Sequence, residues 1–264
     1  MQKVNVLGVS IDPLRLDEML AYIQGAIAAD QRALVAHVNA TGLCLACEHA
    51  WLRQFFNQAD LVFCDGMGVK LAARLLGYHI PERYTLADWM WRLIDVLACN
   101  NHSLYLLGNP PGVPERAAGR LQAKCSGLTI AGTQHGFFDK TPGSAENEAV
   151  LDQINSLKPD ILMVGMGMPL QERWLNENWP RLDVNVAVTC GALFEYIAGD
   201  LPRGPRWMTD HYLEWLARLL ISPRRYGKRY LRDNPVFLYR VLMQKFHKDP
   251  YCNLTVDASQ ETKS

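Results

Sequence analysis

Residues 61–68, which read Leu-Val-Phe-Cys-Asp-Gly-Met-Gly, decide the fold class. Four consecutive apolar residues are typical of a strand that is buried on both faces, and the two glycines that follow are typical of a tight turn. The next residues have helical periodicity. The segment therefore predicts a strand that turns directly into a helix, which is the repeating unit of a parallel sheet.

The same unit recurs along the chain. Further apolar runs lie at Val4–Val9, Ala33–Val38, Ser103–Leu107, Leu128–Ala131, Ile161–Gly165 and Val184–Val188. A longer segment with helical periodicity follows each run, so the pattern predicts an α/β fold with a mostly parallel sheet covered by helices on both faces. Such sheets bind ligands at the carboxyl ends of their strands.

The composition is that of an ordinary folded protein. Of the 264 residues, 49% are apolar and 20% are charged, which excludes an intrinsically disordered chain. No apolar stretch approaches the roughly 18 residues of a membrane span, and the N-terminus lacks a secretory signal. The seven scattered cysteines fit a reducing compartment. We therefore expect a cytoplasmic location.

The zero net charge hides an asymmetry. Residues 203–248 contain 11 Lys and Arg but only three acids, and aromatic residues alternate with the basic ones. Such a segment fits an anionic membrane face, nucleic acid, or a solvated helical hairpin, and the aromatic residues favour the membrane. We divide the chain into a core (1–200), a basic amphipathic appendage that associates with the membrane (201–250) and a disordered tail (251–264).

Glycines follow four of the predicted strands. They include Gly66, Gly108 and Gly167, together with Gly191. A glycine at such a turn lets the backbone approach a phosphate, whose charge a helix N-terminus favours. The turns therefore indicate a nucleotide ligand, although tight packing alone explains any single one of them.

Three polar residues stand at predicted strand ends. Asp65 is positioned to take a proton from a hydroxyl nucleophile, or it caps the next helix. Asn39 has the same two interpretations. His37 is a candidate acid, base or hydrogen-bond donor, although a lone histidine at a strand end is more often structural.

Other residues are candidates for binding the nucleotide ligand. Arg83 could meet a phosphate or form an exposed ion pair, and Gln171 and Glu172 could hold sugar or ribose hydroxyls, while Glu172 could instead favour the helix N-terminus. The chain has no Asp-X-Asp sequence, which is a pair of acids that commonly holds a diphosphate through a divalent metal. Its absence favours neutralisation of a diphosphate by cations and helix N-termini instead of a metal. We expect neither a metal nor a cofactor.

Together these segments resemble the WecG/TagA/CpsF family of bacterial glycosyltransferases, also called glycosyltransferase family 26. The resemblance runs from about Val6 to Arg232. Its strongest parts are ADLVFCDGMGVKLAARLLG, Pro81-Glu82-Arg83, LYLLGNPPGV, GTQHGFF, GMGMPLQERW, GALFEYIAGDLPRGPRW and LEWLARLLISPRRYGKRY.

The resemblance implies a Rossmann-like core and an inverting transfer without metal. It also implies a UDP-sugar donor, a polyprenyl-diphosphate-linked saccharide as acceptor, and peripheral attachment to the inner face of the plasma membrane. We expect the product to belong to cell-surface or exopolysaccharide synthesis. Nucleic acid is not an expected partner, and a homo-oligomer is left open.

Position by position, the resemblance implies that Asp65 is the catalytic base. It implies substrate contacts for Asn39, Arg83 and Gln171, and for the appendage cations Arg218, Arg225, Lys228 and Arg229. His37 departs from the threonine of members that transfer N-acetylmannosamine, so a hexose such as glucose remains an alternative to that sugar.

Two other classes share parts of this pattern. A nucleotide-binding oxidoreductase has the same fold, but no strand end here offers a full Gly-X-Gly-X-X-Gly with an acid about 20 residues further on. A non-enzymatic membrane-binding adaptor would use the basic appendage alone. A comparison of NAD(P)H binding with UDP binding separates the oxidoreductase from a glycosyltransferase. Liposome flotation together with a DNA-binding assay tests the adaptor.

Overall fold

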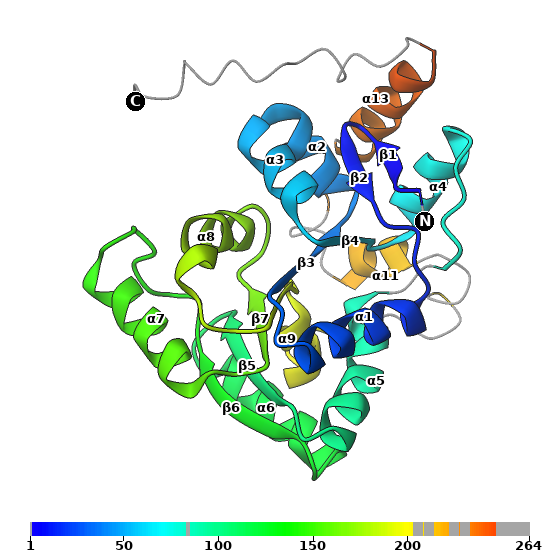
Figure 1. Cartoon of the computed structure of the whole chain (residues 1–264). Helices are drawn as coiled ribbons and strands as arrows, with labels where there is room; N and C mark the ends of the chain where they lie inside the picture. Colours follow the sequence, from blue (N-terminus) through cyan, green and yellow to red (C-terminus); the bar gives the residue numbers. More distant parts are fainter. Residues whose placement is uncertain are drawn as a thin grey trace.

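The computed structural model describes residues 2–82, 85–202, 214–221 and 233–246, together with Met208 and Gly227. Its centre is a six-stranded sheet in the order β4-β3-β8-β7-β5-β6, in which all neighbouring strands are parallel (Figure 1). The strands are β3 (Ala33–Val38), β4 (Leu61–Cys64), β5 (Ser103–Gly108), β6 (Thr129–Gln134), β7 (Ile161–Gly165) and β8 (Val186–Thr189). The predicted fold class is confirmed.

Helices cover both faces of this sheet. One face carries α2 (Ala40–Glu48), α3 (Ala50–Gln58), α4 (Met67–Leu75), α7 (Ala145–Leu157), α8 (Leu170–Asn178) and α13 (Asn234–Phe246). The other face carries α1 (Leu16–Ala28), α5 (Leu86–Cys99), α6 (Val113–Lys124) and α9 (Leu193–Ala198). A short 3-10 helix, η1 (Trp179–Arg181), follows α8, and α11 (Glu214–Ile221) precedes α13. The described elements thus form three layers.

The alternation of side chains along each strand explains why its residues are apolar in succession. Along β3, Leu34, Ala36 and Val38 enter the core on the α2 face, whereas Ala33 and Val35 enter the core on the α1 face. Every residue of β3 is buried. A strand between two helical layers has no polar face, so apolar residues are required at consecutive positions.

The prediction of a first parallel strand at residues 4–9 is wrong. Residues 4–9 do not form one strand of the parallel sheet but belong to an antiparallel hairpin of β1 (Val4–Val6) and β2 (Val9–Ile11). The chain reverses at Leu7 and Gly8, whose φ angles are 53° and 80°. Two successive residues with positive φ match the twist of a tight hairpin turn and end the strand after three residues.

The glycine turns at the strand ends have the expected backbone. Gly66, Gly108, Gly167 and Gly191 all have positive φ, between 56° and 127°. At Gly108 a side chain is also excluded by space, because a Cβ atom there would overlap the backbone carbonyl of Gly165. Close approach of β5 and β7 therefore requires glycine at this position.

The last described helix is docked on the core. Phe237 and Val241 of α13 are buried in the core cluster that includes residues of α2 and α4. The Gln244 side-chain oxygen accepts a hydrogen bond from the Leu7 backbone N–H at 2.8 Å, and Arg240 donates to the Cys44 carbonyl at 2.8 Å. This part of the predicted appendage therefore packs against the sheet domain. The predicted disordered tail, residues 251–264, lies outside the described residues.

Within the described ranges, no helix has the length and apolar character needed to cross a bilayer.

Candidate functional site

A cavity of about 290 Å³ opens at the carboxyl ends of the central strands. Residues at or just after strand ends line it: His37 and Asn39 of β3, Asp65 of β4, Gly167 and Met168 of β7, and Cys190, Gly191 and Ala192 of β8. Residues in or next to three helices complete the lining: Thr41 of α2, Thr85, Leu86 and Ala87 at the start of α5, and Leu193 and Tyr196 of α9. Four strands therefore contribute to one wall, which is where a parallel sheet of this type binds its ligands.

Asp65 follows β4 and stands at the edge of this cavity. Its backbone N–H donates to the Val38 carbonyl at 2.9 Å, which joins the end of β4 to the end of β3 and brings Asp65 beside Asn39. The N-cap position of α4 belongs to Gly66, not to Asp65. The interpretation of Asp65 as a helix cap is therefore wrong, and its carboxylate is available to the cavity.

His37 lies on β3 with 3% of its surface exposed, and Thr189 of the neighbouring β8 orients its ring. The Nδ1 atom lies 2.8 Å from the Thr189 Oγ1 and 3.0 Å from the Thr189 carbonyl oxygen, while the His37 backbone N–H donates to the same hydroxyl at 2.9 Å. These contacts hold Nδ1 toward β8, and the Nε2 side of the ring faces Gly191 across the cavity wall.

Asn39 is both a cap and a cavity residue. Its side-chain oxygen accepts from the Gly42 N–H at 3.0 Å, so the predicted capping of α2 is confirmed. Because the oxygen is engaged, the Nδ2 amide group is the part of Asn39 that remains for a ligand. Thr41, one residue into the same helix, also lines the cavity.

The turn after β8 is held by two side chains behind the cavity wall. The Gln171 Oε1 atom accepts from the Gly191 N–H at 2.9 Å, and the Asn109 Nδ2 group donates to the Gly191 carbonyl at 3.1 Å. Gln171 is completely buried. It is not among the residues that line the cavity in the described part of the chain.

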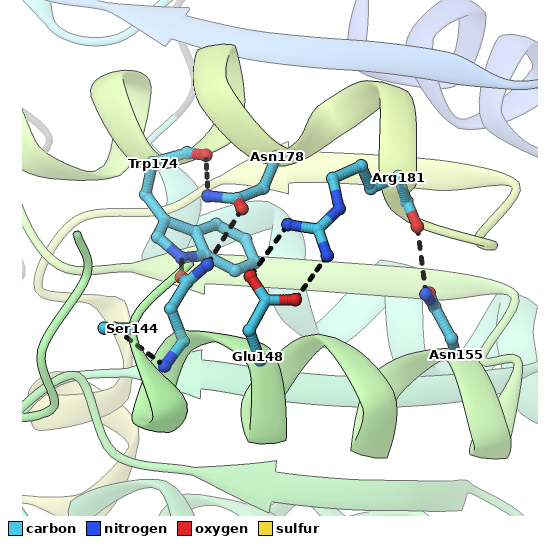
Figure 2. A network of polar contacts seen from close by, with 7 residues as sticks. Ser144, Glu148, Asn155, Trp174, Asn178 and Arg181 are labelled. Carbon is cyan, nitrogen blue, oxygen red and sulfur yellow. Dashed lines mark hydrogen bonds and ion pairs between the residues drawn. The ribbon is translucent and has the colours of Figure 1, made fainter. Parts of the chain in front are cut away.

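A second polar cluster fixes the far half of α8 (Figure 2). The Trp174 Nε1–H donates to the Asn147 side-chain oxygen at 2.8 Å, and Asn147 in turn donates to Asn178 at 3.1 Å. Asn178 completes the cluster by donating to the Trp174 carbonyl at 2.8 Å. This cluster joins α7 to the second half of α8.

The structure brings together several of the predicted site residues. His37, Asn39, Asp65 and Gly167 line one cavity, and Gly66 directly follows Asp65. Gly108 lies at the end of β5, beside Asn109. Arg83, Arg225, Lys228 and Arg229 lie outside the described residues, as does the side chain of Arg218.

Sequence reasoning missed Thr189 and Asn109. Both come directly after or at the end of an apolar run, which is the signal that singled out Asp65 and Asn39. Asn109 carries a further sign in the structure, because its φ of 61° places a residue other than glycine in the left-handed region.

Comparisons with known proteins identify the family of this chain. Residues 4–250 match the model of the "Glycosyl transferase WecG/TagA/CpsF family". An N-acetylglucosaminyldiphosphoundecaprenol N-acetyl-beta-D-mannosaminyltransferase of Staphylococcus aureus strain NCTC 8325 / PS 47 is 29% identical over 245 residues, which are 92% of this chain and 93% of that protein. The protein of the same name from strain MW2 is 28% identical over the same shares. This chain belongs to the WecG/TagA/CpsF family and is a glycosyltransferase.

Proposed function

We propose that this glycosyltransferase moves a hexose or an N-acetylmannosamine-type sugar from a UDP-sugar to a saccharide linked to a polyprenyl diphosphate. The observation that carries the proposal is the cavity into which Asp65, Asn39 and His37 converge from two strands. The relatives support the substrate class, because their name states transfer of N-acetylmannosamine to N-acetylglucosaminyl-diphosphoundecaprenol. We place the product in cell-surface or exopolysaccharide synthesis.

Asp65 acts as the general base in this proposal. Its carboxylate takes the proton from an acceptor hydroxyl, and the oxygen of that hydroxyl forms a bond to the anomeric carbon of the donor sugar. The bond between the anomeric carbon and the diphosphate oxygen breaks at the same time, and its electron pair leaves with UDP. Attack from the face opposite the diphosphate inverts the configuration at the anomeric carbon.

The departing diphosphate needs positive charge and hydrogen-bond donors. The glycine turn at Gly167 borders the cavity and lets backbone N–H groups approach a phosphate. Arg83 and the appendage cations Arg218, Arg225, Lys228 and Arg229 complete the neutralisation in this proposal. Cations suit a chain without an Asp-X-Asp sequence, so we propose a transfer that needs no metal.

His37 is the residue that we propose to select the donor sugar. Its ring is held through Nδ1 by Thr189, so the Nε2 side is presented at a fixed place beside Gly191. A fixed ring edge discriminates between sugars by the hydroxyl or acetamido group that it meets. The choice between glucose and N-acetylmannosamine therefore falls to this position.

We further propose that the protein works on the inner face of the plasma membrane. Apolar side chains on the outer side of α13 are exposed, among them Tyr239 at 63% and Phe246 at 73%, and Leu220 of α11 is 68% exposed. Aromatic residues beside Lys and Arg favour the headgroup region of an anionic bilayer. Flotation with anionic vesicles tests this location, and a Phe246→Ser, Tyr239→Ser double variant that still floated fully would contradict it.

A donor screen tests the proposed function. UDP-glucose, UDP-N-acetylglucosamine and UDP-N-acetylmannosamine are each incubated with a short-chain polyprenyl-diphosphate N-acetylglucosamine, and products are read by mass spectrometry. We expect one added sugar and release of UDP, with no loss of activity in EDTA. Absence of transfer from every UDP-sugar, together with binding of NAD(P)H in preference to UDP, would support the oxidoreductase alternative instead.

A further inference from the structure

The first turn of α8 contains two adjacent polar side chains that are both completely buried. Gln171 and Glu172 have no exposed surface, and the Gln171 Nε2 group donates to the Glu172 Oε1 atom at 2.7 Å. The other end of the Gln171 amide accepts the Gly191 N–H at 2.9 Å. Both ends of this amide are therefore used inside the protein.

The contact with Glu172 decides which way the Gln171 amide points. An amide presents an oxygen at one end and an NH2 group at the other, and the two ends have nearly the same shape. Glu172 Oε1 accepts a hydrogen bond, so the NH2 end faces it and the oxygen faces Gly191. In the reverse orientation the NH2 group would meet the Gly191 N–H, which is also a donor, and the turn would have to move.

Gly191 is held from its other side as well. Asn109 is 7% exposed, and its Nδ2 group donates to the carbonyls of Gly191 at 3.1 Å and Gly165 at 2.5 Å. Gly191 lines the cavity, and a Cβ atom built on it would lie 3.8 Å from the His37 Nε2 atom. The Gly191 turn is therefore clamped between two buried amides, and it carries part of the wall that faces His37.

The second oxygen of the Glu172 carboxyl is buried as well. Its Oε2 atom is buried and has no hydrogen-bond partner among the described residues. A buried carboxyl oxygen without a partner costs free energy, which an apolar residue at this place would avoid. Burial raises the pKa of Glu172 to about 7, while the hydrogen bonds from Gln171 and from its own backbone oppose that rise.

We propose that Glu172 is a positioning residue for sugar transfer, because it fixes the orientation of the Gln171 amide and thereby the place of the Gly191 turn in the cavity wall. Gln171 belongs to the same chain of contacts. It does not contact the substrate itself, and it acts on the reaction by holding the cavity wall at Gly191. This inference rests on the proposed function for its effect on rate, but the hydrogen bond at Gly191 is measurable without any substrate.

Two variants of one residue form the matched pair. Glu172→Gln keeps an oxygen that accepts from Gln171, whereas Glu172→Leu has similar volume and no acceptor. Gln171→Met removes the same contact from the other side and serves as a second test if Glu172→Leu folds poorly. The readouts are the hydrogen-exchange rate of the Gly191 amide, with the core amide of Val188 as internal reference, and kcat and KM for the transfer.

We expect the Gly191 amide of Glu172→Leu and Gln171→Met to exchange about tenfold faster relative to Val188, and kcat to fall about tenfold with KM for the acceptor nearly unchanged. Glu172→Gln should keep both values within about threefold of those of the wild type. An unchanged Gly191 exchange rate in Glu172→Leu would overturn the inference. Equal changes of exchange rate and kcat in Glu172→Gln and Glu172→Leu would overturn it as well.

A fourth variant separates this inference from the proposed function. Asp65→Asn should lose turnover and leave the Gly191 exchange rate as in the wild type, because it does not touch the clamp. If the wild type transferred no sugar at all, the proposed function would fail. The exchange rates would still decide whether Glu172 holds the Gly191 turn.

Discussion

The two halves of α8 bury polar side chains in opposite ways. In the second half, Trp174, Asn178 and Asn147 of α7 bond to one another, and none of their side-chain polar atoms is left without a partner (Figure 2). In the first turn, each end of the Gln171 amide has a hydrogen-bond partner, but Glu172 keeps one oxygen without a partner in the described structure. The satisfied half lies against α7, and the unsatisfied half lies behind the cavity.

This difference separates a cluster that holds two helices together from a pair of side chains that lies behind the cavity wall. A complete hydrogen-bond network repays the desolvation of its members and locks two helices together. The Glu172 carboxyl has one buried oxygen without a partner among the described residues, which lowers stability, and its other oxygen orients the Gln171 amide that holds the Gly191 turn of the cavity wall. We therefore expect changes in the first half to alter catalysis, besides the pH-dependent stability that Glu172 contributes, and changes in the second half to alter stability alone.

The largest expected effect is on rate, at the cavity itself. Asp65→Asn removes the proposed base without removing bulk, so we expect kcat to fall by about 10²–10⁴-fold. Because the Asp65 side chain does not cap α4, the melting temperature should stay as in the wild type. Steady-state transfer kinetics beside thermal unfolding check this, and a variant that kept near wild-type turnover would remove Asp65 from the mechanism.

The next effect is on stability, in the satisfied half of α8. Asn147→Ala leaves the Trp174 indole N–H and the Asn178 side-chain oxygen without partners in a buried site. At about 1–3 kcal/mol for each orphaned group, the free energy of unfolding should fall by about 4 kcal/mol. Urea unfolding measures the loss. The kcat of the folded fraction should change little. A large loss of kcat in the folded fraction would contradict the assignment of this half of α8 to stability.

The third effect is a pH dependence from Glu172. Its pKa is about 7 in the folded protein against 4.5 ordinarily, so the folded state keeps a proton that the unfolded chain has already lost. The Glu172 contribution to stability is complete below pH 4.5 and is lost as the pH rises toward about 7. At about 1.4 kcal/mol per pH unit, the loss across this interval is about 3 kcal/mol.

Glu172→Gln cannot release a proton, so its free energy of unfolding should fall less steeply with pH over this interval. The comparison needs unfolding curves of both proteins at several values between pH 4.5 and 7.5, after subtraction of changes common to both. Parallel curves would show that folding does not change the pKa of Glu172, contrary to the rise that its burial predicts.

The smallest effect belongs to the exposed end of the same polar cluster. Arg181 of η1 pairs with Glu148 of α7, and half of the Arg181 side chain is exposed. Solvent screens such pairs and side-chain entropy opposes them. Glu148→Gln should therefore leave the urea midpoint where it is, and a shift as large as that of Asn147→Ala would mean that burial does not rank these contacts.

Much of the fold was readable from the sequence, because its signals are local. The apolar run at 61–64 with the glycines after Asp65 predicted a buried strand and its turn, and the positive φ of Gly66 agrees. The hairpin at residues 4–11 was missed, because the apolar run was taken as one strand. Gly8, between two runs that alternate apolar and polar residues, was the available signal.

The candidate site was readable only in part, because its remaining contacts join residues far apart in the chain. Asp65, Asn39 and His37 were found from their places at strand ends. The partners of Gln171 and His37 could not be found in this way, because Gly191 is 20 residues from Gln171 and Thr189 is 152 residues from His37. Only the order of strands in the sheet brings these pairs together.

The most direct test of this account is a crystal structure with an unreactive analogue of the UDP-sugar that the donor screen selects. We expect the diphosphate to lie against the glycine turns and the anomeric carbon to face Asp65 inside the cavity at the carboxyl ends of β3, β4, β7 and β8, with the Gly191 turn in its present place. A donor bound elsewhere, with Asp65 remote from the anomeric carbon, would contradict the assignment of this cavity as the site of sugar transfer.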